Sequence, residues 1–326
     1  MNNSNLPIAP DKPWLAPMAG FSDLPFRLLC RELGCAAACT EMISAKGLVL
    51  GQASWSLLDT CPEDKPLVVQ LFGAEQSYIK QAMVRLLDQG FQYFDLNAGC
   101  AVKKVTKTGA GAALLLEPAR LVDLAGEMLN LAGPGRAGVK LRLGWDKDRE
   151  TFLQIARELE KLPAGWITLH PRTARQSFSG QADWSRLQEL QECVELSVLG
   201  SGDLFTAEQG LDCLRRTGVR GLMFARGALS QPGIFGEFKT GLQDALQAAA
   251  EETKELEPAE LDIKGIALRH IELSRQYARH PRAFFKMRTV IPKYMRGMQG
   301  ARELRSRIVA CRDWLELEQL VQGFKI

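Results

Sequence analysis

Eight short apolar runs, each followed by a segment with helical hydrophobic spacing, occupy the chain from residue 14 to residue 229. The runs are Trp14–Gly20, Ala36–Ile43, Pro66–Gly73, Tyr93–Cys100, Ala137–Gly144, Gly165–Thr173, Glu195–Asp203 and Gly221–Leu229. Between them apolar residues recur at helical spacing, as in Phe152, Ile155, Ala156 and Leu159. The alternation of strand and helix predicts an α/β protein, and eight such units predict a (β/α)8 TIM barrel.

An open, doubly wound sheet is the alternative arrangement for the same alternation. Such sheets more often carry a glycine-rich dinucleotide-binding turn after the first strand. Here the first run ends in Pro17-Met18-Ala19-Gly20, which does not have that pattern. We therefore expect the closed barrel.

The 326 residues, 46% of them hydrophobic, suit one large core of about 200–250 residues and a smaller unit. The segment Gln243–Glu260 is rich in Ala and Glu, contains Pro258 and has no apolar stripe, which indicates a solvated helix and a linker. Helical spacing returns in residues 263–277, 282–295 and 301–317, before a short end at 318–326. We predict a barrel domain over residues 1–245, a linker over 246–262 and a helical domain over 263–326.

Positive charge is concentrated in the predicted helical domain. From Lys264 to Arg307 there are twelve Lys and Arg residues and two Glu, a net charge of +10, whereas the whole chain carries +3 and the remainder therefore −7. Phe284, Phe285 and Tyr294 are interleaved with these cations. Cations beside aromatic rings suit phosphate contacts and base stacking, so we expect RNA as the partner of this domain.

No stretch of the sequence is as long and apolar as a membrane helix, and residues 1–12 are polar. We therefore expect a cytoplasmic protein without a membrane partner, whose eight cysteines are reduced. Cys30, Cys35 and Cys39 are close in sequence, but their spacing matches no common zinc or iron–sulfur pattern, and we expect no metal.

Nearly every apolar run ends in polar or conformationally special residues, and in a barrel these ends meet at one mouth. They are Pro17, Met18, Ala19, Gln70, Asn97, Cys100, Lys140, Arg142, His170, Arg172, Ser201, Gly202, Asp203, Ala225 and Arg226. The small residues after the last two runs, with the guanidinium group of Arg226, suit a phosphate group. Together with Gln70 and Lys140 they predict a phosphorylated cofactor with a hydrogen-bonding ring, and FMN meets these needs.

Cys100 lies in a glycine-flanked loop at the end of the fourth run, and Lys103 and Lys104 follow it. A single cysteine is more often a small buried apolar residue, but this one is not on a periodic apolar face. Nearby cations favour the thiolate, whereas a thiol in the same place can deliver a proton. The residues alone make Cys100 a candidate catalytic group and leave its role as nucleophile or acid open.

The segment Asp95-Leu96-Asn97-Ala98-Gly99-Cys100, followed by Lys103-Lys104-Val105, resembles the signature of the tRNA-dihydrouridine synthases, and most closely their bacterial B-type subgroup. These flavoenzymes reduce uridines in tRNA. The resemblance implies that FMN is bound by Pro17, Met18, Ala19, Gln70, Lys140, His170, Ser201, Gly202, Asp203, Ala225 and Arg226. His170-Pro171-Arg172-Thr173 is similar to the family's His-x-Arg-Thr segment.

The resemblance also implies a reaction. NADPH reduces FMN, the reduced flavin N5 passes a hydride to C6 of a flipped-out uracil, and Cys100 protonates C5. Asn97, Arg142 and Arg172 are the implied substrate contacts beside the flavin. The family's C-terminal helical domain binds tRNA, and Lys286 and Arg288 stand where it has a basic helix. We expect a monomer.

The chain departs from the family's pattern at three positions: Ala101 replaces Pro, Ser201 replaces Asn and Ala225 replaces Gly. The methyl group of Ala225 is expected to weaken flavin binding. Two other functions stay open: an FMN barrel reductase of a small molecule, in the manner of dihydroorotate dehydrogenases, and a catalytically weak RNA-binding protein. The sequence does not choose between tRNA and rRNA, between NADPH and NADH, or among uridine positions.

Overall fold

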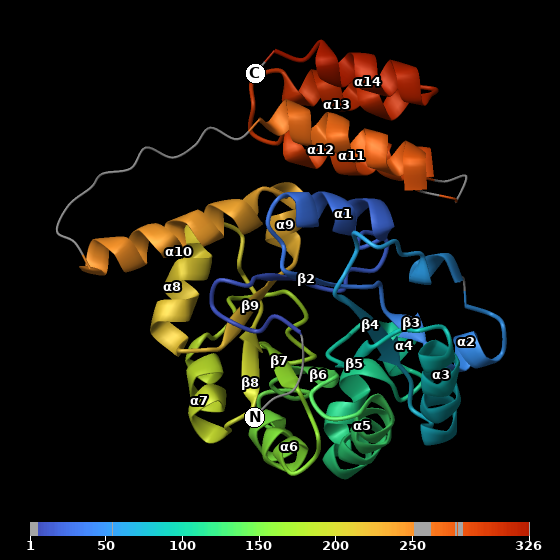
Figure 1. Cartoon of the computed structure of the whole chain (residues 1–326), viewed down its shortest axis with the longest axis vertical. Coiled ribbons are helices and arrows are strands. Elements are labelled where there is room, and N and C mark those ends of the chain that lie inside the picture. The colour runs from blue at the N-terminus through green and yellow to red at the C-terminus, as the bar shows by residue number, and fades with distance from the viewer. Residues whose placement is uncertain (1–5, 54, 251–261, 278, 280–282, 326) are drawn as a thin grey trace.

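The computed structural model describes residues 6–53, 55–250, 262–277, 279 and 283–325, and its eight parallel barrel strands form a closed ring (Figure 1). These strands are β1 (Trp14–Leu15), β2 (Ala37–Cys39), β4 (Leu67–Phe72), β5 (Tyr93–Ala98), β6 (Ala137–Arg142), β7 (Trp166–His170), β8 (Ser197–Gly200) and β9 (Gly221–Phe224). Pairing of β1 with β9 and of β2 with β4 closes the ring. The predicted TIM barrel is confirmed, and the open sheet is excluded.

The second predicted strand is interrupted. Residues 36–43 contribute β2 and the start of a two-residue strand, β3 (Ile43–Ser44), which pairs with β4. Between β2 and β3, the hydroxyl oxygen of Thr40 accepts from the backbone N–H of Gln70 at 3.1 Å and donates to the carbonyl of Glu41 at 2.8 Å. A side chain therefore takes a position in the hydrogen-bond ladder, and the run does not continue as one strand.

Helices cover the outside of the barrel (Figure 1). They are α1 (Leu24–Glu32), α3 (Gln76–Asp88), α5 (Pro118–Ala132), α6 (Phe152–Glu160), α7 (Ser185–Cys193), α8 (Ala207–Thr217) and α10 (Ile234–Ala250), with short elements α2 (Ala45–Val49), η1 (Trp55–Leu58), α4 (Lys103–Thr106), η2 (Gly111–Leu116) and α9 (Arg226–Ser230) in the loops. All four spaced apolar residues of α6 are buried against the sheet. A second apolar cluster, which includes Trp14, Val68 and Trp166, fills the interior of the barrel.

Four further helices lie beyond α1 and α9 (Figure 1). They are α11 (Ile263–Tyr277), α12 (Ala283–Tyr294), α13 (Ala301–Ala310) and α14 (Trp314–Gln322). Two ion pairs join them to the barrel: Arg269 contacts Glu32 at 2.6 Å, and Lys286 contacts Asp23 at 2.6 Å. The helical unit is therefore packed along α1 through α11, and its helix α12 reaches the loop that follows β1.

The single helix expected over residues 301–317 is wrong, because the chain breaks between α13 and α14. Cys311 is extended, and the carboxylate of Asp313 caps α14 by accepting from the backbone N–H of Glu316 at 2.8 Å. The carboxylate of Glu316 accepts in turn from the N–H of Arg312 at 2.8 Å. These two hydrogen bonds mark the start of a new helix, which the spacing of apolar residues did not reveal.

The predicted end of the barrel domain, residue 245, falls inside α10, which runs to Ala250. Of the predicted linker, residues 251–261 lie outside the described residues. The three-part division of the chain therefore stays a prediction. None of the helices among the described residues combines the length and the apolar character needed to cross a bilayer.

Candidate functional site

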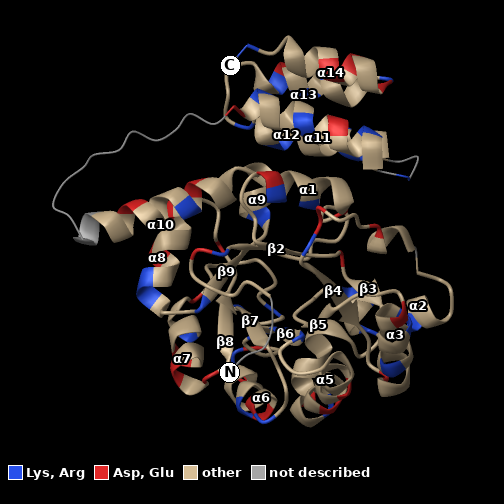
Figure 2. Cartoon of the chain, viewed as in Figure 1, with Lys and Arg blue, Asp and Glu red and all other residues tan. Residues whose placement is uncertain are grey.

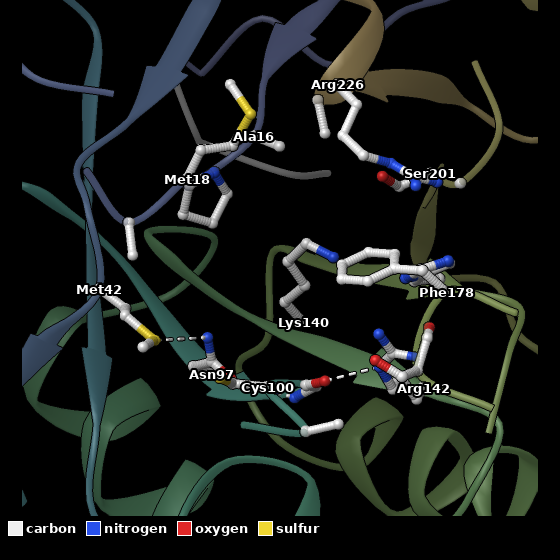
Figure 3. A pocket seen from close by; sticks show the side chains of 18 of the residues that line it. Ala16, Met18, Met42, Asn97, Cys100, Lys140, Arg142, Phe178, Ser201 and Arg226 are labelled. Carbon is white, nitrogen blue, oxygen red and sulfur yellow. Dashed lines mark hydrogen bonds between the residues drawn. The ribbon is translucent and has the colours of Figure 1, made fainter. Parts of the chain in front are cut away.

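A cavity of about 480 Å³ opens at the carboxyl ends of the barrel strands (Figure 3). It is lined by Pro17, Met18, Ala19, Gln70, Asn97, Cys100, Lys140, Arg142, His170, Ser201, Gly202, Asp203, Ala225 and Arg226, among others. These are the strand-end residues expected at the mouth, with the exception of Arg172. A mouth that gathers side chains from many strands is the position at which TIM barrels hold their active sites.

A chain of hydrogen bonds runs under one wall of this cavity. The Nε2 of Gln70 donates to Oδ2 of Asp95 at 2.7 Å, and the Nδ2 of Asn97 donates to Oε1 of Gln70 at 2.8 Å. The Oδ1 of Asn97 accepts from the backbone N–H groups of Gly99 at 3.1 Å and Cys100 at 2.9 Å. The turn that carries the half-buried Cys100 thiol is thus fixed from below by three side chains of β4 and β5.

Arg142 fixes the same turn from the other side. Its Nε donates to the carbonyl of Gly99 at 2.7 Å, and one terminal nitrogen donates to the carbonyls of Thr173 at 2.9 Å and Ser177 at 2.7 Å. Burial lowers the pKa of Arg142 to about 10, so the side chain keeps its charge near pH 7. Arg142 therefore ties the turn after β5 to the loop after β7 and leaves a cation at the cavity wall.

Lys140 projects into the cavity (Figure 3). Burial lowers the pKa of Lys140 to about 8, against the opposing effect of Asp95. Burial likewise raises the pKa of Asp95, against the opposing effects of Gln70 and Lys140. Burial therefore moves the pKa values of both groups toward neutral pH, as is common at functional sites.

His170 is held neutral. Burial and the cations around it, first among them Lys140, lower the pKa of His170 to about 2. Its Nε2 lies 3.1 Å from a terminal nitrogen of Arg172, which can only donate, so the imidazole proton resides on Nδ1. The backbone of Gly202 packs against this ring, because a Cβ there would lie 2.6 Å from Cδ2 of His170.

The loops after β8 and β9 meet at Asp203. Its carboxylate pairs with Arg172 at 2.6 Å and with Arg226 at 3.1 Å, and although burial acts to raise the pKa of Asp203, these arginines hold it below its usual range. The guanidinium group of Arg226 also lies between the rings of Phe178 and Phe205, at 4.6 and 4.9 Å from their centroids. Arg226 thus stands at the cavity rim beside the small residues of both loops.

Three predicted substrate contacts lie away from the cavity lining. Arg172 is buried and donates to His170, Asp203 and two backbone carbonyls, so it positions the loops after β7 and β8. Lys286 donates to the carbonyl of Phe21 at 3.2 Å and pairs with Asp23, and Arg288 lies over the rings of Phe284 and Phe285. Both belong to α12, at the boundary between the helical unit and the barrel.

The sequence reasoning missed several cavity residues, among them Phe21, Phe178 and Phe205. Phe178 is exposed, follows Ser177 with its positive φ of 51°, and covers the guanidinium group of Arg142 at 5.6 Å. Apolar side chains in loops have no periodicity that would mark them. The one available signal was the position of each residue a few places beyond a strand end.

Figure 2 shows Lys and Arg residues along the helices of the helical unit, and Lys286 of this unit contacts Phe21 in the cavity wall. The Nζ of Lys293 lies 6.0 Å from the ring centroid of Phe21, a residue of the cavity wall. Of the described Lys and Arg residues between positions 264 and 307, Arg269, Arg275 and Lys286 form ion pairs. The other eight form no ion pair with any residue that the structure describes. An unneutralised surface of this kind is typical of a nucleic-acid contact.

All eight cysteines are free thiols, and Cys30, Cys35 and Cys39 are buried. Burial raises the pKa of each of these three thiols, as expected for packing residues. The described part of the chain contains no group of three or more His, Cys, Asp or Glu residues arranged to hold a metal ion.

The family model described as dihydrouridine synthase (Dus) matches residues 14–325. A probable tRNA-dihydrouridine synthase of Aquifex aeolicus is 31% identical over 314 residues, which cover 95% of this chain and 95% of that protein. A tRNA-dihydrouridine synthase B of Xanthomonas campestris pv. campestris is 35% identical over 234 residues, which cover 71% of this chain and 69% of that protein. Among solved structures, a mutant morphinone reductase in complex with tetrahydroNAD is similar in fold, with a TM-score of 0.50 and 11% identity over 71% of this chain and 86% of that one.

Proposed function

Because the chain belongs to the dihydrouridine synthase family, we propose that it is an FMN-dependent tRNA-dihydrouridine synthase that uses NADPH and acts in the cytoplasm. The observation that carries this proposal is the cavity in which Cys100, Lys140 and His170 come together from three neighbouring strands. A thiol beside a cation and a neutral imidazole can supply one proton and orient a polar ring.

The residues of the cavity fit FMN. Gly202 is a position that only glycine fills without moving His170, so the backbone of this loop can approach a phosphate closely, and Arg226 supplies the charge. Gln70, Lys140 and His170 would hold the ring, Pro17, Met18 and Ala19 would cover it, and Ser201, Gly202, Asp203, Ala225 and Arg226 would hold the phosphate. Bound FMN, reduced by NADPH, supplies the hydride that C6 of the uracil accepts.

Cys100 is the proposed acid for C5 of that uracil. Its thiol is half-buried at the cavity wall, and its backbone is fixed by Asn97 below and, through Gly99, by Arg142 beside it. A fixed donor costs little reorganisation when the proton moves. Asn97 and Arg142 therefore act chiefly by positioning Cys100, and Lys140 is the cation beside the flavin ring.

Turnover is expected to fall as pH rises through about 8. Because burial lowers the pKa of Lys140 to about 8, its positive charge is present below this pH and is lost above it. His170 should add no limb near pH 6.5, since its pKa is lowered to about 2. The check is the rate of dihydrouridine formation against pH in the wild type and in Lys140→Met. The Cys100→Ala variant is measured in the same way, because a general acid must also carry its proton. An alkaline limb that survives in Lys140→Met but disappears in Cys100→Ala would assign the limb to the thiol and refute the assignment to Lys140.

The helical unit is the proposed tRNA contact. It carries eight described cations without ion pairs, and Lys293 lies beside a wall residue of the cavity. A tRNA held on this surface would have one nucleotide within reach of the mouth once that nucleotide leaves its stack. Lys286 and Arg288 support the surface by fixing α12 to the barrel and to its own aromatic residues.

Reversing two charges on this surface, Lys293→Glu with Arg296→Glu, is expected to weaken tRNA binding at least tenfold at low salt. The slope of log affinity against log salt should fall by about two, one for each lost phosphate contact. The matched control is Arg136→Glu with Arg220→Glu, since these exposed residues precede β6 and β9 at the opposite end of the barrel. Equal losses of tRNA affinity in both double variants would mean that the net charge of the protein, and not this surface, determines tRNA binding.

The experiment that tests the function is mapping of dihydrouridine in tRNA and rRNA from cells with and without this gene. A dihydrouridine that disappears on deletion and returns with the wild-type gene supports the proposal and identifies the uridine. A protein that binds FMN and oxidises NADPH but changes no RNA position would instead favour a small-molecule substrate.

A further inference from the structure

Asp95 is a charged residue in the middle of a buried strand. It lies on β5 with no solvent exposure, and its side chain enters the barrel interior, where apolar residues such as Trp166 dominate. Its Oδ2 accepts from Gln70. Burial raises the pKa of Asp95, and the indole of Trp166, whose N–H has no other partner among the described residues, acts with Gln70 against that rise. A carboxyl group costs free energy in such a place, so its retention calls for a role.

One consequence of Asp95 is the direction of the hydrogen-bond chain above it. Because Oδ2 of Asp95 is an acceptor, Gln70 turns its NH₂ group toward Asp95 and its Oε1 toward Asn97. Asn97 must then donate through Nδ2, which leaves Oδ1 for the N–H groups of Gly99 and Cys100. The acceptor oxygen of Asp95 at one end of this hydrogen-bond chain thus determines that the Oδ1 of Asn97 faces the Cys100 turn at the other end.

The second consequence concerns Lys140 on the neighbouring strand. In the register of β5 and β6, Asp95 is opposite Gly138 and Asn97 is opposite Lys140, so Lys140 is one inward-facing position further toward the mouth than Asp95. The titratable or charged groups that act on Lys140 are Asp95, Cys39, Cys100, Arg142 and, from β7, His170. Asp95 is the one carboxylate of this set, and it opposes the effect of burial on Lys140.

We propose that Asp95 is a positioning residue, whose carboxylate orients Gln70, Asn97 and hence the Cys100 turn, and whose charge keeps Lys140 a cation. It touches neither flavin nor substrate. This inference deepens the proposed function, on which its catalytic meaning rests, but both of its physical effects belong to the protein alone.

The charge effect is tested by competitive acylation of Lys140 with acetic anhydride across a pH series, with peptide mass spectrometry as the readout. Asp95→Asn keeps the shape and an acceptor oxygen but removes the charge, so the pH at which Lys140 becomes reactive should fall by about one unit or more. Thr168→Val is the matched control, since it changes a buried polar residue opposite Lys140 without changing charge. An unshifted midpoint in Asp95→Asn overturns the charge effect.

The positioning effect is tested by hydrogen exchange of the Gly99 and Cys100 amides in the flavin-loaded protein. Asp95→Leu should speed this exchange about tenfold or more, Asp95→Asn should leave it nearly unchanged, and Asn97→Leu should reproduce the faster exchange while Asp95 stays charged. Exchange in Asp95→Leu or Asn97→Leu at the wild-type rate overturns the positioning role. Should Asp95→Leu fail to fold, Asn97→Leu decides the positioning role, and Asp95→Asn, which keeps the shape of the side chain, decides the charge effect. Neither readout needs turnover, so a failure of the proposed function is seen separately as absence of dihydrouridine with the wild type.

Discussion

Replacing Cys100 with alanine is expected to lower the rate of dihydrouridine formation by about 10²–10⁴-fold, the range typical of losing a positioned general acid. The flavin should remain bound, because the proposed cofactor contacts come from other strands and the Cys100 backbone keeps its hydrogen bond to Asn97. The measurement is single-turnover reduction of a tRNA transcript by the prereduced protein, together with the absorbance spectrum of the bound flavin.

Cys193→Ala is the control for this variant. Cys193 is also a half-buried free thiol, but its Sγ lies 3.2 Å from Nε of Arg157, on the outer helices of the barrel. The Cys193→Ala protein should form dihydrouridine at the wild-type rate. A Cys100→Ala protein that loses its flavin would show that the thiol is structural. Full activity in Cys100→Ala would show that Cys100 is not the acid.

The barrel could be predicted from the sequence because each strand buries a continuous apolar run and each outer helix a spaced apolar face, as in α6. The details that failed depend on single side chains. The hydroxyl of Thr40 interrupts the second apolar run. The carboxylate of Asp313 caps the start of a new helix, α14, inside a segment whose apolar spacing predicts a single helix. Such local hydrogen bonds carry no period, so a pattern of apolar residues does not reveal them.

The candidate site was predictable as a set of positions but not as a set of contacts. Strand ends in a barrel converge, so Cys100, Lys140 and His170 could be placed together from their positions after strands. The sequence did not reveal which atoms are in contact. Arg172, for example, pairs with Asp203, which lies 31 residues further along the chain, and its side chain is buried behind the cavity wall. Asp95 belongs to the segment that resembles the family signature, but its hydrogen bond to Gln70 becomes visible only when β4 and β5 are paired.

Replacing Asp64 with alanine is expected to lower the free energy of unfolding by about 3–5 kcal/mol, the usual cost of breaking a buried ion pair from one side. Asp64 has no solvent exposure, and its carboxylate accepts from Arg27 at 2.7 and 2.9 Å and from Arg31 at 3.1 Å. The side chain of Arg27 is only 1% exposed, so its charge would stay in the interior without a carboxylate to neutralise it. Urea unfolding followed by tryptophan fluorescence measures the change.

Asp212→Ala is the matched control, because Asp212 also pairs with two arginines, Arg215 and Arg216, but at the surface. Water and salt screen that cluster, so its loss should be small. The buried pair also reaches the candidate site: a terminal nitrogen of Arg27 donates to the carbonyl of Ser22 at 2.7 Å, and the Ser22 hydroxyl accepts from the N–H of Met18 in the cavity wall. Asp64→Ala should therefore weaken flavin binding along with the fold, and equal stability losses in the two variants would mean that burial of the Asp64 cluster contributes nothing.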